Sequence, residues 1–184
     1  MNIKDILSQA EEKMKKSIDV IIREFSTIRT GRAHTSLVDN IRVDYYGTPT
    51  SLKQLASIST ADARLIVIQP WDVSVIGDIE KAIFKSELGI TPSNDGKVIR
   101  LGIPMLTKER RAELIKVVHK LTEDGRIAIR SIRRDANEHI KQFEKEHKVT
   151  EDESFKAQDN IQKLTDKYIK QLDELLKNKE AEIM

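Results

Sequence analysis

One stretch decides the fold, Arg126-Ile127-Ala128-Ile129-Arg130-Ser131-Ile132-Arg133-Arg134-Asp135-Ala136-Asn137. At about 100° per residue, Arg126, Arg130 and Arg133 fall on one stripe of a helix, and Asn137 continues it. An apolar set falls together on another face: Ala128, Ile129, Ile132, Ala136, Ile140 and Phe143. The apolar face must be buried, and no carboxylate stands directly between the arginines. The pattern therefore predicts a bundle helix whose arginine stripe faces solvent or a polyanion.

Apolar residues recur every three or four positions in three long segments, which predicts helices over 1–29, 107–147 and 151–182. Thr107 is a suitable N-cap for the second of these helices. Thr150 and Glu153 have the spacing of a capping box at the start of the third. Isolated amphipathic helices are only marginally stable in water, so the three should pack against one another. The short loop between the last two helices makes them antiparallel. Gly125 lies on the apolar side, where it would allow a neighbouring helix to approach closely.

The segment between the first two helices has a different character. Alternating or continuous apolar runs predict strands near 41–46, 64–69 and 98–103, and a polar, β-branched stretch at 56–60 is a further candidate strand. Helical spacing predicts a helix from 75 to about 88. Gly31 is expected to end the first helix. The fold class is therefore α+β: an elongated three-helix bundle formed by 1–30 and 106–184, with a small β/α/β domain, 31–105, inserted on a two-stranded hinge. The expected hinge residues are Arg29, Thr30, Gly31, Arg32 and Pro104.

Composition points to a cytoplasmic protein. The 184 residues include no cysteine, and the N-terminus lacks a basic and apolar leader. No window approaches the roughly 20 apolar residues of a membrane span. Net charge is only +2, but 107–134 holds nine Lys/Arg against four Asp/Glu, whereas 150–184 holds six Lys against nine Asp/Glu. Phosphate affinity depends on such local fields.

The chain shows no enzymatic motif: no phosphate-cradling Gly-rich loop and no zinc-binding His-Glu-x-x-His. Its four histidines are scattered, so we expect no catalytic residue, metal or cofactor. The arginine stripe is the sharper signal, because the planar guanidinium suits bidentate phosphate contacts. The candidate RNA-binding residues are Arg110, Arg111, Arg126, Arg130, Arg133, Arg134 and Asn137. An alternative stays open, in which the arginines only form ion pairs on a solvated face, with neighbours such as Glu123 or Glu138.

Several motifs resemble the bacterial ribosome recycling factor family along the full length of the chain. They are Ile28-Arg29-Thr30-Gly31-Arg32-Ala33, Tyr45-Tyr46-Gly47-Thr48-Pro49, Leu55-Ala56-Ser57, Arg130-Ser131-Ile132-Arg133-Arg134-Asp135-Ala136-Asn137 and Gln162-Lys163-Leu164-Thr165-Asp166. The resemblance implies an L-shaped molecule with a flexible hinge. It implies binding to the post-termination ribosome across the A and P sites, and subunit splitting together with elongation factor G and GTP.

The resemblance also assigns roles to particular residues. Arg130 and Arg133 match family arginines that face large-subunit ribosomal RNA. The turn at Tyr45, Tyr46, Gly47, Thr48 and Pro49 would face elongation factor G. A monomer without membrane contacts is expected. Two rivals remain at this stage: a helical adaptor that binds a protein through an exposed apolar seam, and an enzyme hidden in the insert.

Overall fold

The computed structural model describes residues 2–184. The chain divides into two compact units, Met1–Arg29 with Thr107–Met184, and Thr30–Leu106. Each unit has its own buried apolar cluster. The α+β class predicted from the pattern is confirmed, because long helices make up the first unit and small sheets dominate the second.

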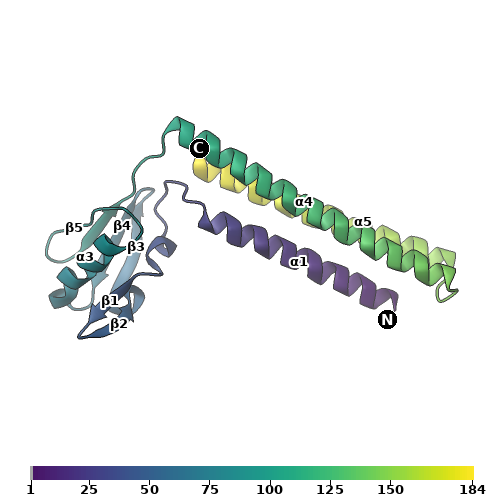
Figure 1. The fold of residues 1–184 in the computed structure, drawn as a ribbon, viewed down its shortest axis with the longest axis horizontal. Coiled ribbons are helices and arrows are strands. Elements are labelled where there is room, and N and C mark those ends of the chain that lie inside the picture. The colour runs from purple at the N-terminus through teal and green to yellow at the C-terminus, as the bar shows by residue number, and fades with distance from the viewer. Residues whose placement is uncertain (1) are drawn as a thin grey trace. The chain divides into compact units, whose positions relative to one another are not determined.

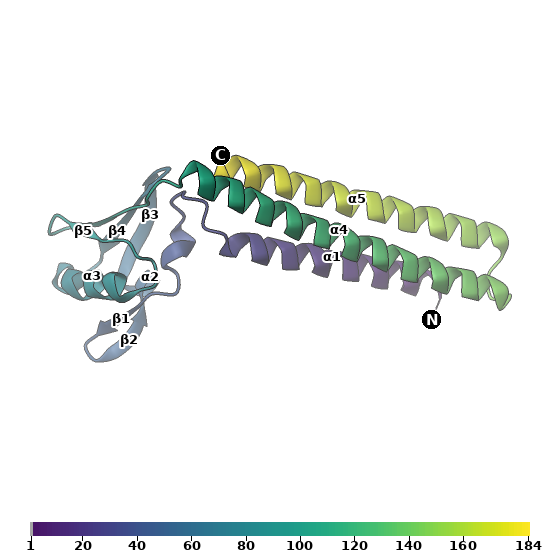
Figure 2. The ribbon, with the colours of Figure 1, turned by 45° about the horizontal axis from the view of Figure 1, so that its top comes forward.

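Three helices form the first unit: α1 (Ile3–Thr27), α4 (Lys108–Lys145) and α5 (Glu151–Ile183). They lie side by side in both ribbon views (Figures 1 and 2), with α4 antiparallel to the other two. At 1.5 Å per residue α4 is about 57 Å long. The predicted helices are therefore confirmed to within two residues at most ends.

The bundle is held together by a continuous apolar seam. At one end Ile6 and Ala10 of α1 pack with Ala136 and Ile140 of α4 and with Ile161 of α5. The buried residues of α1 are Ile6, Ala10, Met14, Ile18, Ile21 and Phe25, spaced three or four apart, and the neighbouring Leu7 and Ser17 are only partly buried.

Small residues occupy the middle of the seam. Gly125 is buried, and a Cβ placed there would lie 3.1 Å from Ile21 Cγ1 and 3.2 Å from Leu172 Cδ1. The close approach expected at this glycine is therefore present. Thr122 and Thr165 are also buried, and each hydroxyl donates to a carbonyl four residues earlier, at 2.9 and 2.8 Å.

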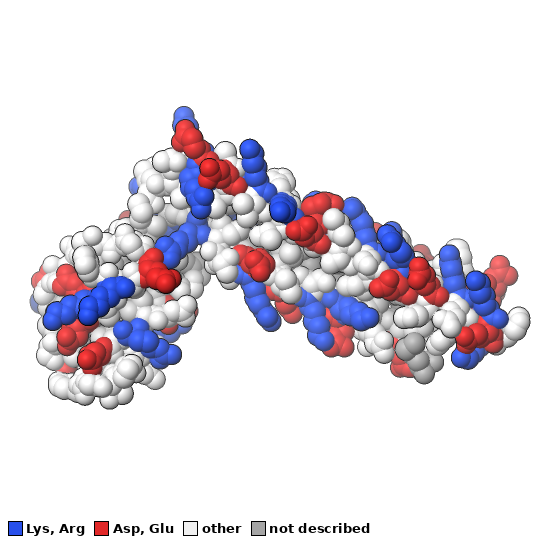
Figure 3. Space-filling model, in the orientation of Figure 1, with Lys and Arg blue, Asp and Glu red and all other residues white. Residues whose placement is uncertain are grey.

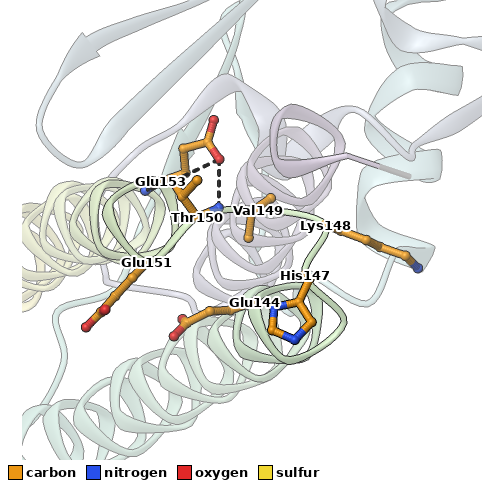
Figure 4. Close-up of a pocket in the computed structure, with 7 residues that line it drawn as sticks. All are labelled: Glu144, His147, Lys148, Val149, Thr150, Glu151 and Glu153. Atoms are coloured by element: carbon orange, nitrogen blue, oxygen red, sulfur yellow. Dashed lines mark hydrogen bonds between the residues drawn. The ribbon is translucent and has the colours of Figure 1, made fainter.

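The caps are where the sequence placed them. Thr107 accepts from the Arg110 N–H, and Thr150 and Glu153 form the reciprocal capping box at the start of α5. Between them α4 ends with His147 at φ 55°, and the Lys148 N–H donates to the Phe143 carbonyl at 3.0 Å. This pattern of a left-handed residue and a six-to-one bond closes the helix end. Figure 4 shows the resulting turn, which borders a surface pocket of about 470 Å³.

The expectation that Gly31 ends α1 is wrong. The helix ends at Thr27, and Ile28 follows in extended conformation. The hydroxyls of Ser26 and Thr27 accompany this end by donating to the carbonyls of Arg23 and Glu24. Gly31 has a separate role: its φ is +73°, and a Cβ there would lie 3.0 Å from Leu106 Cγ.

The second unit contains two antiparallel sheets. One pairs β1 (Arg42–Tyr45) with β2 (Thr48–Ser51). The other has the order β3-β4-β6-β5, from β3 (Ala56–Asp62), β4 (Leu65–Pro70), β6 (Ile99–Gly102) and β5 (Ser93–Asn94). Helix α3 (Ile76–Lys85) supplies Ile79 and Ile83 to the shared core. Short helices complete the unit: η1 (Thr35–Val38), α2 (Leu52–Leu55) and η2 (Val73–Val75).

The sequence pattern missed β2, β5 and the short helices. Strand pairing also begins at Thr48 and at Ser93, which lie outside the four predicted strands. Both missed strands have exposed or half-exposed side chains throughout, so they carry no apolar alternation to detect. Within residues 2–184, no helix combines the length and apolar character needed to cross a membrane.

Replacing Gly125 by valine should lower the free energy of unfolding of the bundle by about 1–3 kcal/mol, because the added carbons overpack the seam against Ile21 and Leu172. Gly77→Val is the matched control, since Gly77 lies in α3 and a Cβ there meets nothing within 4 Å. Urea unfolding followed by circular dichroism measures both. Equal stability of the two variants would contradict the close approach at Gly125.

Candidate RNA-binding surface

The arginine stripe lies along α4 on the side that borders α5. Arg126 contacts Asp173 of α5, and Arg133 Nη1 donates to Gln162 Oε1 of α5 at 3.1 Å. Seven residues separate Arg126 from Arg133, about 10 Å along the helix. The structure therefore places Arg126 and Arg133 in one row along the side of α4 that borders α5.

Arg126 is largely neutralised within the chain. Its Nη2 is 2.5 Å from Asp173 Oδ1 and its Nη1 is 2.9 Å from Glu123 Oε2, with the side chain only 23% exposed. Asp173 first and Glu123 second raise the pKa of the guanidinium. No carboxylate lies between the stripe arginines in the sequence, but Glu123, which precedes them, and Asp173 of α5 neutralise Arg126, which the sequence pattern did not predict. Arg126 links α4 to α5.

Arg130 is only partly neutralised within the chain. Its Nη1 is 3.3 Å from Glu123 Oε1, and both side chains are about half exposed. Glu123 therefore serves two arginines, and Arg126 first, then Arg130, hold the pKa of its carboxyl below its usual range. The alternative of ion pairing with Glu123 is thus present at two of the stripe arginines.

Beyond Arg130 the stripe arginines form no ion pair with a carboxylate among residues 2–184. Arg133 contacts only the amide of Gln162, and Arg134 is exposed with no hydrogen bond or ion pair within the described chain. Asn137 is partly buried, its side-chain oxygen has no hydrogen-bond partner in the described chain, and its amide nitrogen is a donor. Cationic and donor groups thus gather between 130 and 137.

Arg110 and Arg111 lie elsewhere on α4. More than 20 residues separate them from Arg133, about 35 Å along the helix. Arg110 pairs with Glu113 at 2.8 Å, and Arg111 Nη1 donates to the Met184 carbonyl at 3.0 Å. The structure does not bring these two arginines together with the rest of the predicted surface. Figure 3 shows acidic and basic side chains interspersed along the face of the bundle that it draws.

The turn between β1 and β2 is prominent in the second unit. Tyr46 is 80% exposed at φ 48°, and Gly47 follows at φ 82°. The Tyr45 and Tyr46 rings meet edge to face, with centroids 4.7 Å apart. A left-handed pair of residues suits a two-residue hairpin turn, so the local backbone presents Tyr46 outward.

The predicted hinge residues fall in segments without helix or strand. Thr30 and Gly31 precede η1, and Pro104 lies between β6 and α4. Arg29 and Arg32 each take part in an interaction within the chain.

Asp173 and Gln162 are the contributors to this surface that the sequence did not reveal. They come from α5, and nothing in a single sequence gives the register between two helices. Glu123, by contrast, lies three residues before Arg126 and seven before Arg130, spacings that place it on the same helix side.

The model of the family described as "Ribosome recycling factor" matches residues 21–184. The chain belongs to the ribosome recycling factor family. A ribosome-recycling factor of Desulforamulus reducens is 58% identical over 182 residues, covering 99% of this chain and 98% of that protein. One from Bacillus pumilus is 51% identical over 181 residues, covering 98% of each.

Solved structures of the family agree with the fold. A solution structure of the ribosome recycling factor superposes with a TM-score of 0.76 at 44% identity, covering 100% of this chain and 98% of the other. A second structure is described as models for the T. thermophilus ribosome recycling factor and the E. coli elongation factor G bound to the E. coli post-termination complex. It has a TM-score of 0.66 at 41% identity, covering 100% and 99%.

Substitutions of the arginines on α4 should differ in their effect on the free energy of unfolding, according to whether the arginine has ion-pair partners. Arg126→Met is expected to lower the free energy of unfolding of the bundle by about 1 kcal/mol, because both carboxylate partners are lost. Arg134→Ala, at an exposed position without a partner, should change it by less than about 0.5 kcal/mol. Urea unfolding compares the stabilities of the two variants. An Arg126→Met protein as stable as Arg134→Ala would show that the Arg126 ion pairs do not stabilise the contact between α4 and α5.

Proposed function

We propose that the protein binds the post-termination ribosome and, with elongation factor G and GTP, separates it into subunits, releasing the messenger RNA. Membership of the ribosome recycling factor family supports this proposal. So does the similarity to a recycling factor described together with elongation factor G on the post-termination complex. The protein would act in the cytoplasm as a monomer, without catalytic chemistry of its own.

The observation that carries the proposed mode of binding is the graded availability of the stripe. Arg133 and Arg134 have no carboxylate partner within the described chain, and Asn137 adds a donor one turn further on. Guanidinium groups facing solvent on a rigid helix suit the phosphates of folded RNA, whose recognition depends on backbone and shape. The bundle would anchor to large-subunit ribosomal RNA through Arg130, Arg133, Arg134 and Asn137.

Arg126, Arg110 and Arg111 have different roles in this proposal. Arg126 pairs with Asp173 and Arg111 donates to the Met184 carbonyl, so moving either one to a phosphate would break a contact between α4 and the α5 segment. We therefore assign Arg126 and Arg111 to bundle stability first. Arg110 forms only an exposed ion pair with Glu113 of its own helix, and it is set apart by its distance of about 35 Å from Arg133.

The second unit would take the mechanical role. Its core is separate, so it can move as a body about the segments at Arg29–Arg32 and near Pro104. The exposed turn from Tyr45 to Pro49 would face elongation factor G, whose GTP hydrolysis supplies the work. The adaptor rival receives no support from the bundle, since its apolar seam is buried against its own helices.

The function is tested by sedimentation. Purified post-termination ribosomes mixed with this protein, elongation factor G and GTP should separate into subunits, and omission of any of the three should leave them intact. A nonhydrolysable GTP analogue is the control for the energy source. Ribosomes that remain whole with all components present would refute the proposal.

The binding surface is tested by Arg133→Ala. The variant should bind purified large subunits about 1–3 kcal/mol more weakly, with a shallower salt dependence, because one phosphate contact is lost. Arg23→Ala on α1 removes the same charge from an exposed position of another helix and should bind nearly normally. Similar losses in the two variants would indicate a general charge effect rather than a specific contact.

A further inference from the structure

Glu123 occupies a particular place in the arginine stripe. One of its oxygens, Oε2, lies 2.9 Å from Arg126 Nη1, while the other, Oε1, lies 3.3 Å from Arg130 Nη1. A single carboxylate thus bridges an arginine committed to the bundle and an arginine of the proposed RNA-binding surface. No other ion pair of Arg130 is present in the described chain.

The two halves of this bridge differ in strength. Arg126 is mostly buried and is held by Asp173 as well, so it is a fixed cation beside Glu123. It keeps the carboxylate ionised and in position, consistent with the lowered pKa of Glu123. The Arg130 half is longer, and both of its side chains are about half exposed, where ion pairs are weak and screened by salt.

An RNA phosphate can therefore displace Glu123 from Arg130 at little cost. When Arg130 turns to the phosphate, Glu123 keeps its contact with Arg126, so no charge is left without a partner. The carboxylate would nonetheless compete for Arg130 whenever the RNA is absent, and it would repel a phosphate at that position. Arg133 and Arg134 face no such competitor.

We infer that Glu123 is a built-in competitor of RNA phosphate at Arg130, a positioning residue that limits how tightly the bundle binds its RNA and favours release. This inference rests on the proposed function, since it requires Arg130 to contact RNA. The proposed RNA-binding surface of α4 would then include one acidic residue among its basic ones.

The test is a double-mutant cycle measured as affinity for purified large ribosomal subunits at several salt concentrations. Glu123→Gln keeps the side-chain shape and a hydrogen bond to Arg126 but removes the charge. It should tighten binding about two- to fivefold, the range expected for an exposed ion pair. The gain should shrink as salt rises, because salt already weakens the competing pair. In an Arg130→Ala background the substitution should give no gain.

Glu12→Gln is the matched control. Glu12 is an exposed carboxylate on α1 that pairs with Lys16 at 2.7 Å, so its loss changes net charge equally without touching an arginine. The folded fraction of each variant is checked by circular dichroism before binding is measured. Tightening by Glu123→Gln alone, absent in the Arg130→Ala background, supports the inference.

Four results would overturn it. Unchanged affinity of Glu123→Gln, while Arg130→Ala and Arg133→Ala weaken binding, would refute the competitor and leave the proposed function standing. An equal gain in Glu12→Gln, or a gain that persists without Arg130, would show a general charge effect and refute it as well. Normal binding by Arg130→Ala and Arg133→Ala would overturn both the inference and the RNA-binding surface on which it rests.

Discussion

A helix of 38 residues with one apolar face has to be covered, and every other feature of the bundle depends on that constraint. Helices α1 and α5 supply the cover, and they approach closely because Gly125, Thr122 and Thr165 keep the middle of the seam narrow. Burial of that face leaves the flanking side of α4, next to α5, for polar groups such as Arg126 and Arg133. The position of the arginine row therefore follows from how the seam is packed.

The same packing decides which arginines are available. Helix α5 brings Asp173 to Arg126 and only an amide, Gln162, to Arg133. Arg126 therefore links α4 to α5 through ion pairs, and Arg130 shares the carboxylate of Glu123. Arg133 and Arg134 have no acidic partner in the part of the chain that the structure describes. A charge count over 107–134 would treat these arginines as equivalent, whereas the structure gives them different roles.

Much of the architecture was visible in the sequence for a physical reason: long amphipathic periods and caps are local signals. Thr107, Thr150 and Glu153 marked helix starts because a cap acts within four residues. The strand at Thr48 and the ion pair with Asp173 could not be found in this way, because one has no apolar alternation and the other depends on helix register. The contact with Glu123, by contrast, is a local one, because a residue three positions before Arg126 and seven before Arg130 lies on the same side of the helix.

The bundle is discontinuous in the chain, since the whole second unit lies between α1 and α4. During synthesis, residues 30–106 emerge as one contiguous piece that contains its entire core. The seam of α1 has to wait for partners near 125–140 and 161–172. At about 5–20 residues per second, that interval is on the order of 5–30 s. The nascent chain thus carries α1 with its apolar face unpacked through most of translation. During that period a chaperone or the ribosome surface would have to shield this face from aggregation.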